Sequence, residues 1–163
     1  MEKGQYRKAL EQFLAAINRE AEDEQSGARD PQINYFVASG YEAIGNDEMA
    51  KMAFEKSARQ ELKSTGLMNY YQALSYKKLG ETEKATTIFN ALIDEGNQML
   101  TTTAETDFFA KFGEKESENV QLSNAWFLKG LGNKGLGNTE EATKNLKKAV
   151  ELSASNLWAK IEL

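Results

Sequence analysis

The sequence predicts an all-α fold built from repeated helical pairs, and three observations lead to this prediction. Four glycines each precede an alanine by five residues: Gly4 and Ala9, Gly45 and Ala50, Gly80 and Ala85, Gly137 and Ala142. A large apolar residue follows each alanine by four residues: Phe13, Phe54, Phe89 and Leu146. The 163-residue chain has a single proline, and 40% of its residues are hydrophobic. Glycine permits a turn that a Cβ would obstruct, and the apolar residues that follow it suit one helical face.

The N-terminal segment, residues 1–22, is expected to be one amphipathic helix. Its apolar residues, including Leu10, Phe13 and Ile17, recur at the 3-and-4 spacing of a helical face. This pattern is that of the second helix of a pair, and the first helix does not precede it. We therefore expect a half repeat here and a chain that is a fragment of a longer protein.

A complete helical pair is expected over residues 31–64, with its turn at Gly45. Asp30 is a favourable N-cap residue. Pro31 is tolerated at the first helical position, because an N–H there would have no helical partner.

The next pair is expected over residues 66–94, and a long insertion follows it. Ala142 lies 57 residues after Ala85, although the preceding interval is 35 residues, which leaves an insertion over residues 95–122. Three β-branched threonines at 101–103 disfavour helix. The preceding helix is therefore expected to run past its usual end and stop near them.

Three phenylalanines of the insertion, Phe108, Phe109 and Phe112, are too apolar for a solvated loop. We expect them to form a short helix or turn packed against the helical pairs. The alternative is an exposed patch that docks another chain.

The last pair is expected over residues 123–154, and a terminal half-helix over 156–163, capped by Ser155 and Asn156. This half-helix carries Trp158 and Ile161. It could serve as a polar-faced end cap, or it could be a cut edge of a longer array.

Composition argues against several functional classes. The net charge is −5 with no basic region overall, which disfavours a nucleic-acid surface. The chain lacks histidine and cysteine, which excludes the common metal sites and histidine-based triads. Its carboxylates lie in surface runs, so we expect no enzyme, and no cofactor or metal. No apolar run reaches the length of a membrane span.

The string Gly130-Leu131-Gly132-Asn133-Lys134-Gly135 matches the G-x-G-x-x-G of dinucleotide-binding folds. That mechanism needs a preceding strand, whereas residues 124–129 have a helical pattern. We expect the string to lie in a helix, where close packing is the interpretation for Gly132 and Gly135.

The glycine, alanine and aromatic pattern resembles the tetratricopeptide repeat, whose period is about 34 residues. The resemblance implies an α-solenoid, or α-α superhelix, of about three and a half repeats with one long insertion. It also implies a concave face, lined by the first helix of each repeat, that binds a peptide or helix. The implied contact residues are Tyr35, Ser39, Tyr70, Leu74, Lys77, Phe127, Leu131 and Lys134.

Two alternatives remain open for these residues. Tyr70 and Phe127 could only pack against neighbouring helices instead of meeting a partner. The family's two-carboxylate clamp is absent, because Tyr35, Ser39 and Tyr71 stand at its positions. Chaperone-tail binding is therefore not expected.

The second half, from about Tyr70 to Leu163, is also similar to the C-terminal repeats of large multi-domain bacterial proteins. Their upstream domain is of unknown, possibly carbohydrate-related, function. The sequence thus predicts a protein-interaction module or scaffold with a protein or peptide partner. The alternative is a structural spacer or dimerisation segment of a larger protein. The compartment stays open, with the cytoplasm slightly favoured.

Overall fold

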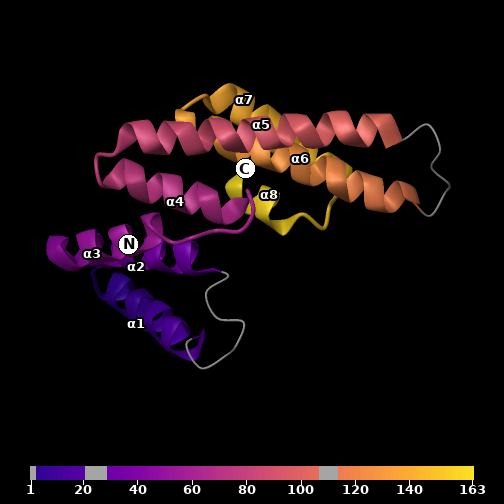
Figure 1. The fold of residues 1–163 in the computed structure, drawn as a ribbon. Coiled ribbons are helices and arrows are strands. Elements are labelled where there is room, and N and C mark those ends of the chain that lie inside the picture. The colour runs from indigo at the N-terminus through magenta and orange to yellow at the C-terminus, as the bar shows by residue number, and fades with distance from the viewer. Residues whose placement is uncertain (1–2, 21–28, 107–113) are drawn as a thin grey trace. The chain divides into compact units, whose positions relative to one another are not determined.

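The computed structural model describes residues 3–20, 29–106 and 114–163 (Figure 1). This part of the chain is all-helical, as predicted, and contains no strand. Its helices are α1 (Lys3–Glu20), α2 (Asp30–Ile44), α3 (Asp47–Ala58), α4 (Leu67–Lys78), α5 (Thr82–Thr106), α6 (Glu114–Leu136), α7 (Thr139–Leu152) and α8 (Leu157–Glu162). Within these residues, no helix is both long and apolar enough to cross a membrane.

Short turns join α2 to α3, α4 to α5 and α6 to α7. We call α2, α4, α6 and α8 the first helices, and α1, α3, α5 and α7 the second helices. The chain divides into two compact units. The first unit comprises Met1–Ser64 and Tyr71–Ala85, and the second comprises Thr65–Tyr70 and Thr86–Leu163. Helices α4 and α5 therefore each contribute residues to both units.

The three predicted turns all depend on a glycine in the left-handed conformation. Gly45, Gly80 and Gly137 have φ values of 82°, 81° and 86°. At the first turn, the Gly45 N–H donates to the Glu42 carbonyl (3.0 Å) and the Asn46 N–H donates to the Tyr41 carbonyl (2.9 Å). The same pair of bonds recurs at the other two glycines. These are Schellman-type C-caps, so the glycine spacing in the sequence reports a repeated helix ending.

The start of α2 differs from the prediction by one residue. Asp30 was expected as N-cap, but it lies inside the helix, and Arg29 stands at the cap. The Ile33 N–H donates to the Arg29 carbonyl at 3.0 Å, so the helical bonding begins one residue earlier. Asp30 instead lies in the first turn, where a carboxylate interacts favourably with the helix dipole.

The predicted insertion is largely accounted for by longer helices. Helix α5 continues through the threonines to Thr106, and α6 already begins at Glu114. The hydroxyls of Thr101 and Thr102 donate to the carbonyls four residues before them, at 3.1 and 3.0 Å. The helix thus ends three residues beyond these threonines, whose hydroxyls are satisfied by its own backbone. Phe108, Phe109 and Phe112 lie outside the described residues.

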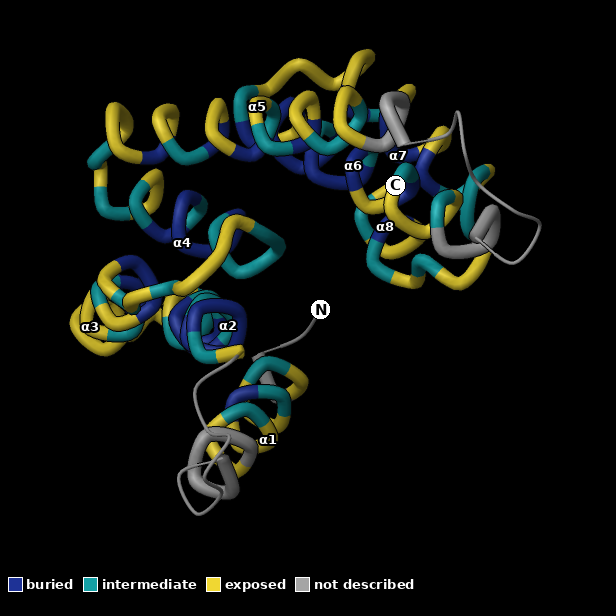
Figure 2. The backbone as a smooth tube through the Cα atoms, turned by 45° about the vertical axis from the view of Figure 1, so that its right-hand side comes forward, coloured by how far each residue is buried: buried dark blue, intermediate teal, exposed yellow. Residues whose placement is uncertain are grey.

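The core of the first unit is filled by aliphatic and aromatic side chains. Leu10, Ile33 and Val37 form one buried cluster that joins α1 to α2. A second cluster joins α2 to α3 and consists of Ala38, Ala50 and Phe54. Figure 2 shows buried residues along α2, whereas α3 is exposed over much of its outer side.

The core of the second unit is built around α6, which lies against α5 and α7. Leu131 is fully buried, and Phe89, Leu92 and Leu146 are each at most 2% exposed. In Figure 2 the buried stretch of α6 is the continuous dark segment. Helix α6 therefore carries many of the buried residues of this unit. Helix α8 packs beside α7.

Candidate interaction surfaces

Half of the eight predicted contact residues lie in the first unit, on two helices. Tyr35 and Ser39 lie on α2, and Leu74 and Lys77 lie on α4. Tyr35, Ser39 and Leu74 are partly exposed, and Lys77 is exposed. The Ser39 hydroxyl donates to the Tyr35 carbonyl at 2.9 Å, so this hydroxyl is already engaged with its own helix.

Two side-chain contacts link α2 to α4, one at each end of this region. At one end, the Tyr35 and Tyr71 ring centroids are 5.5 Å apart. At the other, Lys78 Nζ lies 2.7 Å from a Glu42 carboxylate oxygen. Tyr35 and Glu42 are seven residues apart, as are Tyr71 and Lys78, which is two helical turns. The segments between these contacts therefore run side by side.

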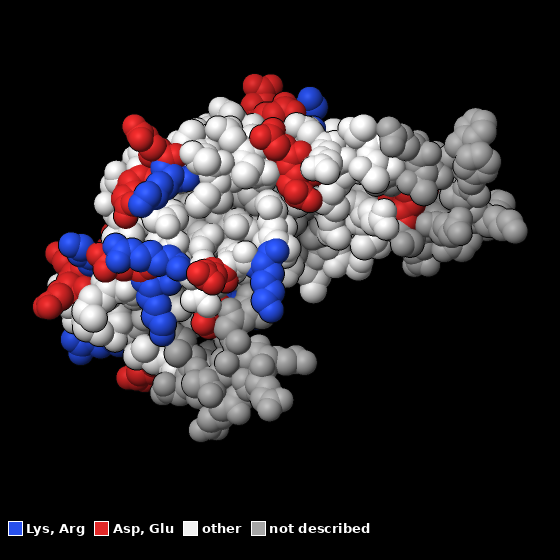
Figure 3. Space-filling view, viewed as in Figure 1, with Lys and Arg blue, Asp and Glu red and all other residues white. Residues whose placement is uncertain are grey.

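We call the residues between and beside these contacts, Tyr35, Ser39, Leu74 and Lys77, the α2–α4 surface. An exposed ion pair such as Glu42–Lys78 contributes little to stability. It does place a carboxylate and an ammonium beside the α2–α4 surface. On the face drawn in Figure 3, basic and acidic side chains alternate over the first unit.

Three other predicted contact residues are buried in this structure. Tyr70, Phe127 and Leu131 are 4%, 6% and 0% exposed. The Tyr70 ring lies 5.9 Å from that of Phe89 within the second unit. Side chains covered to this extent offer a partner little to touch, which favours the packing interpretation left open for Tyr70 and Phe127.

The remaining predicted residue, Lys134, is exposed near the end of α6 and holds the last helix. Its ammonium lies 2.8 Å from Glu162 Oε2 and 2.7 Å from the Glu162 carbonyl oxygen. The Asn156 amide, just before α8, donates to the Ser123 hydroxyl at 3.0 Å. Lys134 therefore already binds a carboxylate that its own chain supplies.

The G-x-G-x-x-G string lies inside α6, and its glycines face neighbouring helices. A Cβ on Gly132 would lie 2.5 Å from the Phe89 carbonyl oxygen. A Cβ on Gly135 would lie 2.2 Å from the Phe89 ring, and one on Gly130 would lie 2.7 Å from Leu146. The string thus accommodates close helix packing, as expected, and no strand precedes it within the described residues.

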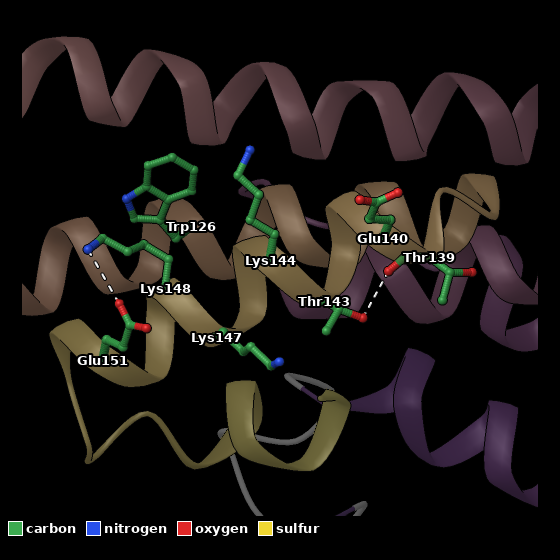
Figure 4. A pocket seen from close by; sticks show the side chains of 8 residues that line it. All are labelled: Trp126, Thr139, Glu140, Thr143, Lys144, Lys147, Lys148 and Glu151. Atoms are coloured by element: carbon green, nitrogen blue, oxygen red, sulfur yellow. Dashed lines mark hydrogen bonds and ion pairs between the residues drawn. The ribbon is translucent and has the colours of Figure 1, made fainter.

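A groove that the sequence did not reveal runs along α7. Its volume is about 910 Å³, and its lining consists of Trp126 and seven residues of α7: Thr139, Glu140, Thr143, Lys144, Lys147, Lys148 and Glu151. Lys129 Nζ lies 4.5 Å from the Trp126 ring centre. Figure 4 shows Lys144 and Lys147 extending to opposite sides of α7. The spacing of lysines in the sequence after Trp126 was the available signal for this groove. Its lining, however, mixes lysines with glutamates, and their charged groups do not point to a common position.

Electrostatics add no catalytic centre in the described part of the chain. The hydrogen bond to Glu81, together with its charge, raises the pKa of the Lys84 ammonium. This pair is exposed and only keeps the lysine charged. Among the described residues, no cluster of acidic side chains could hold a metal ion.

Comparison with protein families matched residues 123–156 to the family described as tetratricopeptide repeat. The matched stretch begins in α6 and ends just before α8, so it contains the whole α6–α7 turn. No curated protein and no solved structure matched the chain.

Proposed function

We propose that this chain, a tetratricopeptide-repeat protein, is an interaction module that binds a peptide or helix on the α2–α4 surface. A repeat of this family indicates protein–protein interaction in general. The observation that carries the finer proposal is that two contacts link α2 to α4. One is between the Tyr35 and Tyr71 rings, and the other is the Glu42–Lys78 ion pair. The ring contact, more than the exposed ion pair, keeps Ser39 and Leu74 on adjoining helices, so binding need not bring them together first.

The chemistry of this surface suggests its partner. Tyr35 offers a partly exposed ring, Leu74 an aliphatic contact and Lys77 an exposed ammonium. Together they suit a segment with an apolar anchor and a neighbouring carboxylate. We therefore expect an acidic, amphipathic partner segment.

The test is a peptide array of acidic amphipathic sequences, followed by fluorescence anisotropy on the hits. Tyr35→Ala and Lys77→Ala should each weaken binding by about tenfold, because hot-spot contacts commonly exceed 1 kcal/mol. The matched control is Lys56→Ala, which removes an exposed lysine from α3. Equal affinities for all three variants would exclude the α2–α4 surface.

The alternative role, a structural spacer or dimerisation segment, has one observation in its favour. Leu157, Ile161 and Leu163 are 64%, 67% and 52% exposed at the end of the chain. Apolar side chains gathered in this way can associate with another chain. Sedimentation velocity over a range of concentrations distinguishes the roles, because self-association without ligand favours this one.

A further inference from the structure

Two opposite charges lie side by side at one end of the α2–α4 surface. The Glu42 carboxylate belongs to α2, and the Lys78 ammonium belongs to α4. Lys78 Nζ lies 2.7 Å from one Glu42 carboxylate oxygen and 3.0 Å from the other. The side chain of Glu42 is 46% exposed and that of Lys78 is 42% exposed, so a bound segment can still reach both groups.

This pair can form hydrogen bonds beyond those that it already makes. A carboxylate offers about four acceptor positions on its two oxygens, and an ammonium offers three donors. Glu42 can therefore accept from a basic side chain of a partner while it contacts Lys78, and Lys78 can donate to a partner's carboxylate. The Lys134–Glu162 pair differs in this respect, because the Glu162 side chain is only 11% exposed.

The charges at this end of the surface are ordered across the two helices. Lys77 and Lys78, at the end of α4, are both exposed and basic, whereas Glu42 is exposed and acidic near the end of α2. The opposite end, where the Tyr35 and Tyr71 rings meet, carries no charge. A bound segment therefore meets an aromatic end and a charged end, and the charged end is negative on α2 and positive on α4.

The spacing of these two ends fits a short extended segment. Tyr35 and Glu42 are seven residues apart on one helix, which corresponds to about 10 Å along its axis. An extended chain covers this length in about three residues. Successive side chains of an extended chain point to opposite sides, so two neighbouring residues at the charged end would point toward α2 and α4.

We propose that Glu42 and Lys78 select the order in which basic and acidic residues follow each other in the partner segment. The segment that fits is extended, with an apolar anchor between Tyr35 and Leu74. About three residues away, it carries a basic residue over Glu42 and an acidic residue over Lys78. A segment with these two charges exchanged brings like charges together, which lowers its affinity. The inference rests on the interaction function proposed above and specifies which segments the surface accepts.

The test uses two labelled peptides of identical composition in fluorescence anisotropy. Each has a leucine anchor and, about three residues later, an adjacent lysine and glutamate within an otherwise acidic sequence. The two peptides differ only in the order of that charged pair. The parent chain should bind one of them about tenfold more tightly than the other. The ratio should approach one at about 1 M salt, where charges are screened within about 3 Å.

The decisive variant exchanges the two charges, by Glu42→Lys together with Lys78→Glu. It retains an ion pair, and the ring contact still links the helices, so it should melt like the parent chain. Its peptide preference should be reversed, with a smaller ratio because Lys77 stays on α4. Glu42→Gln together with Lys78→Gln should lose most of the preference. The matched control is Glu141→Lys together with Lys144→Glu, which exchanges another exposed pair and should keep the parent's preference.

Three outcomes would overturn the proposal. The first is equal binding of the two peptides by the parent chain, or the same preference in the parent and the charge-exchanged variant. The second is a preference that persists at high salt, because shape and not charge would then decide it. The third is dimerisation of the parent chain that the double glutamine variant abolishes, because this would assign the pair to a second copy.

Failure of this inference and failure of the proposed function give different results. If both peptides bind equally and Tyr35→Ala weakens both by about tenfold, the α2–α4 surface binds segments without selecting their charge order. Only this inference then fails. If neither peptide binds the parent chain, the surface does not bind such segments, and both proposals fail.

Discussion

The two units share the same glycine turn but fill the space between their helices in opposite ways. In the first unit, rings meet in sequence: Phe13 with Phe36, Phe36 with Tyr71, Tyr71 with Tyr35, and Tyr35 with Phe54, all with centroids 5.4–5.8 Å apart. In the second unit, helices approach closely over glycines: a Cβ on Gly96 or Gly132 would meet a backbone oxygen of the neighbouring helix, and one on Gly130 or Gly135 would meet a side chain. Removing a ring from a ring-filled core leaves a cavity, whereas a Cβ added at a close contact between helices has no room. The first unit should therefore be sensitive to lost volume and the second to added volume.

The largest expected effect is the loss of a ring from the first unit. Phe54 is 4% exposed and packs against Ala38 and Ala50. Phe54→Ala should lower the free energy of unfolding by about 3–5 kcal/mol, because it leaves a cavity. Urea unfolding followed by circular dichroism measures this. Phe54→Leu, which keeps most of the volume, should lose less than half as much, and equal midpoints for the two variants would contradict the ring-filled core.

The next effect is the addition of a single methyl group to the second unit. A Cβ on Gly132 would meet the Phe89 carbonyl oxygen at 2.5 Å and Ile93 Cγ1 at 2.6 Å. Gly132→Ala should destabilise by about 1–3 kcal/mol, although alanine favours helix by about 1 kcal/mol over glycine. Thermal melts measure the change. The matched control is Gly66→Ala, which has open space around its Cβ, and a Gly132 variant that melts as high would refute the backbone contact.

A smaller effect of opposite sign is expected at a buried amide of the second unit. Asn145 is fully buried on α7, and its side-chain atoms have no hydrogen-bond partner among the described residues. The corresponding residue in the first unit, eight positions after its turn glycine, is Ala53. Asn145→Leu should raise the free energy of unfolding by about 1–2 kcal/mol, because an unsatisfied buried amide is removed. Calorimetry measures it, and destabilisation would imply that the amide is bonded.

The smallest expected effect is the difference in stability between variants of two serines, Ser57 and Ser123, whose hydrogen bonds link helices in opposite directions. Ser57, on a second helix, donates to the Pro31 carbonyl on a first helix. Ser123, on a first helix, donates to the Ala149 carbonyl on a second helix, also at 2.7 Å.

Ser57→Ala should be the more costly of the two, at about 1 kcal/mol. It removes the acceptor of the fully buried Ser75 hydroxyl, whereas Ser123→Ala removes the acceptor of the only partly buried Asn156 amide and leaves Ala149 accepting the Ser153 N–H. Chemical unfolding of both variants tests this order. A larger loss for Ser123→Ala would reverse the comparison.

The sequence predicted best those features that depend on local chemistry. A glycine at a left-handed turn has few substitutes, so Gly45, Gly80 and Gly137 were recognisable from spacing alone. Ala85 and Ala142, which follow the turn glycines by five residues, are 1% and 3% exposed.

Features that depend on neighbouring helices were harder to predict. The burial of Leu131 is decided by what packs over α6, which no spacing reveals. The pairing of Lys134 with Glu162 joins residues 28 positions apart, and neither belongs to a recognisable motif. The sequence therefore predicted a set of contact residues, and the structure shows which of them are exposed.

The glycines of α6 also bear on the order in which the chain folds. Gly130, Gly132 and Gly135 each weaken an isolated helix by about 1 kcal/mol relative to alanine. On its own, this helix would start from an unfavourable nucleation equilibrium. It becomes stable only when α5 and α7 supply the surfaces that its glycines fit. Repeat arrays can in general begin folding at any repeat. In this chain, nucleation should avoid α6, so this helix should form on the surfaces that α5 and α7 supply and not serve as their template.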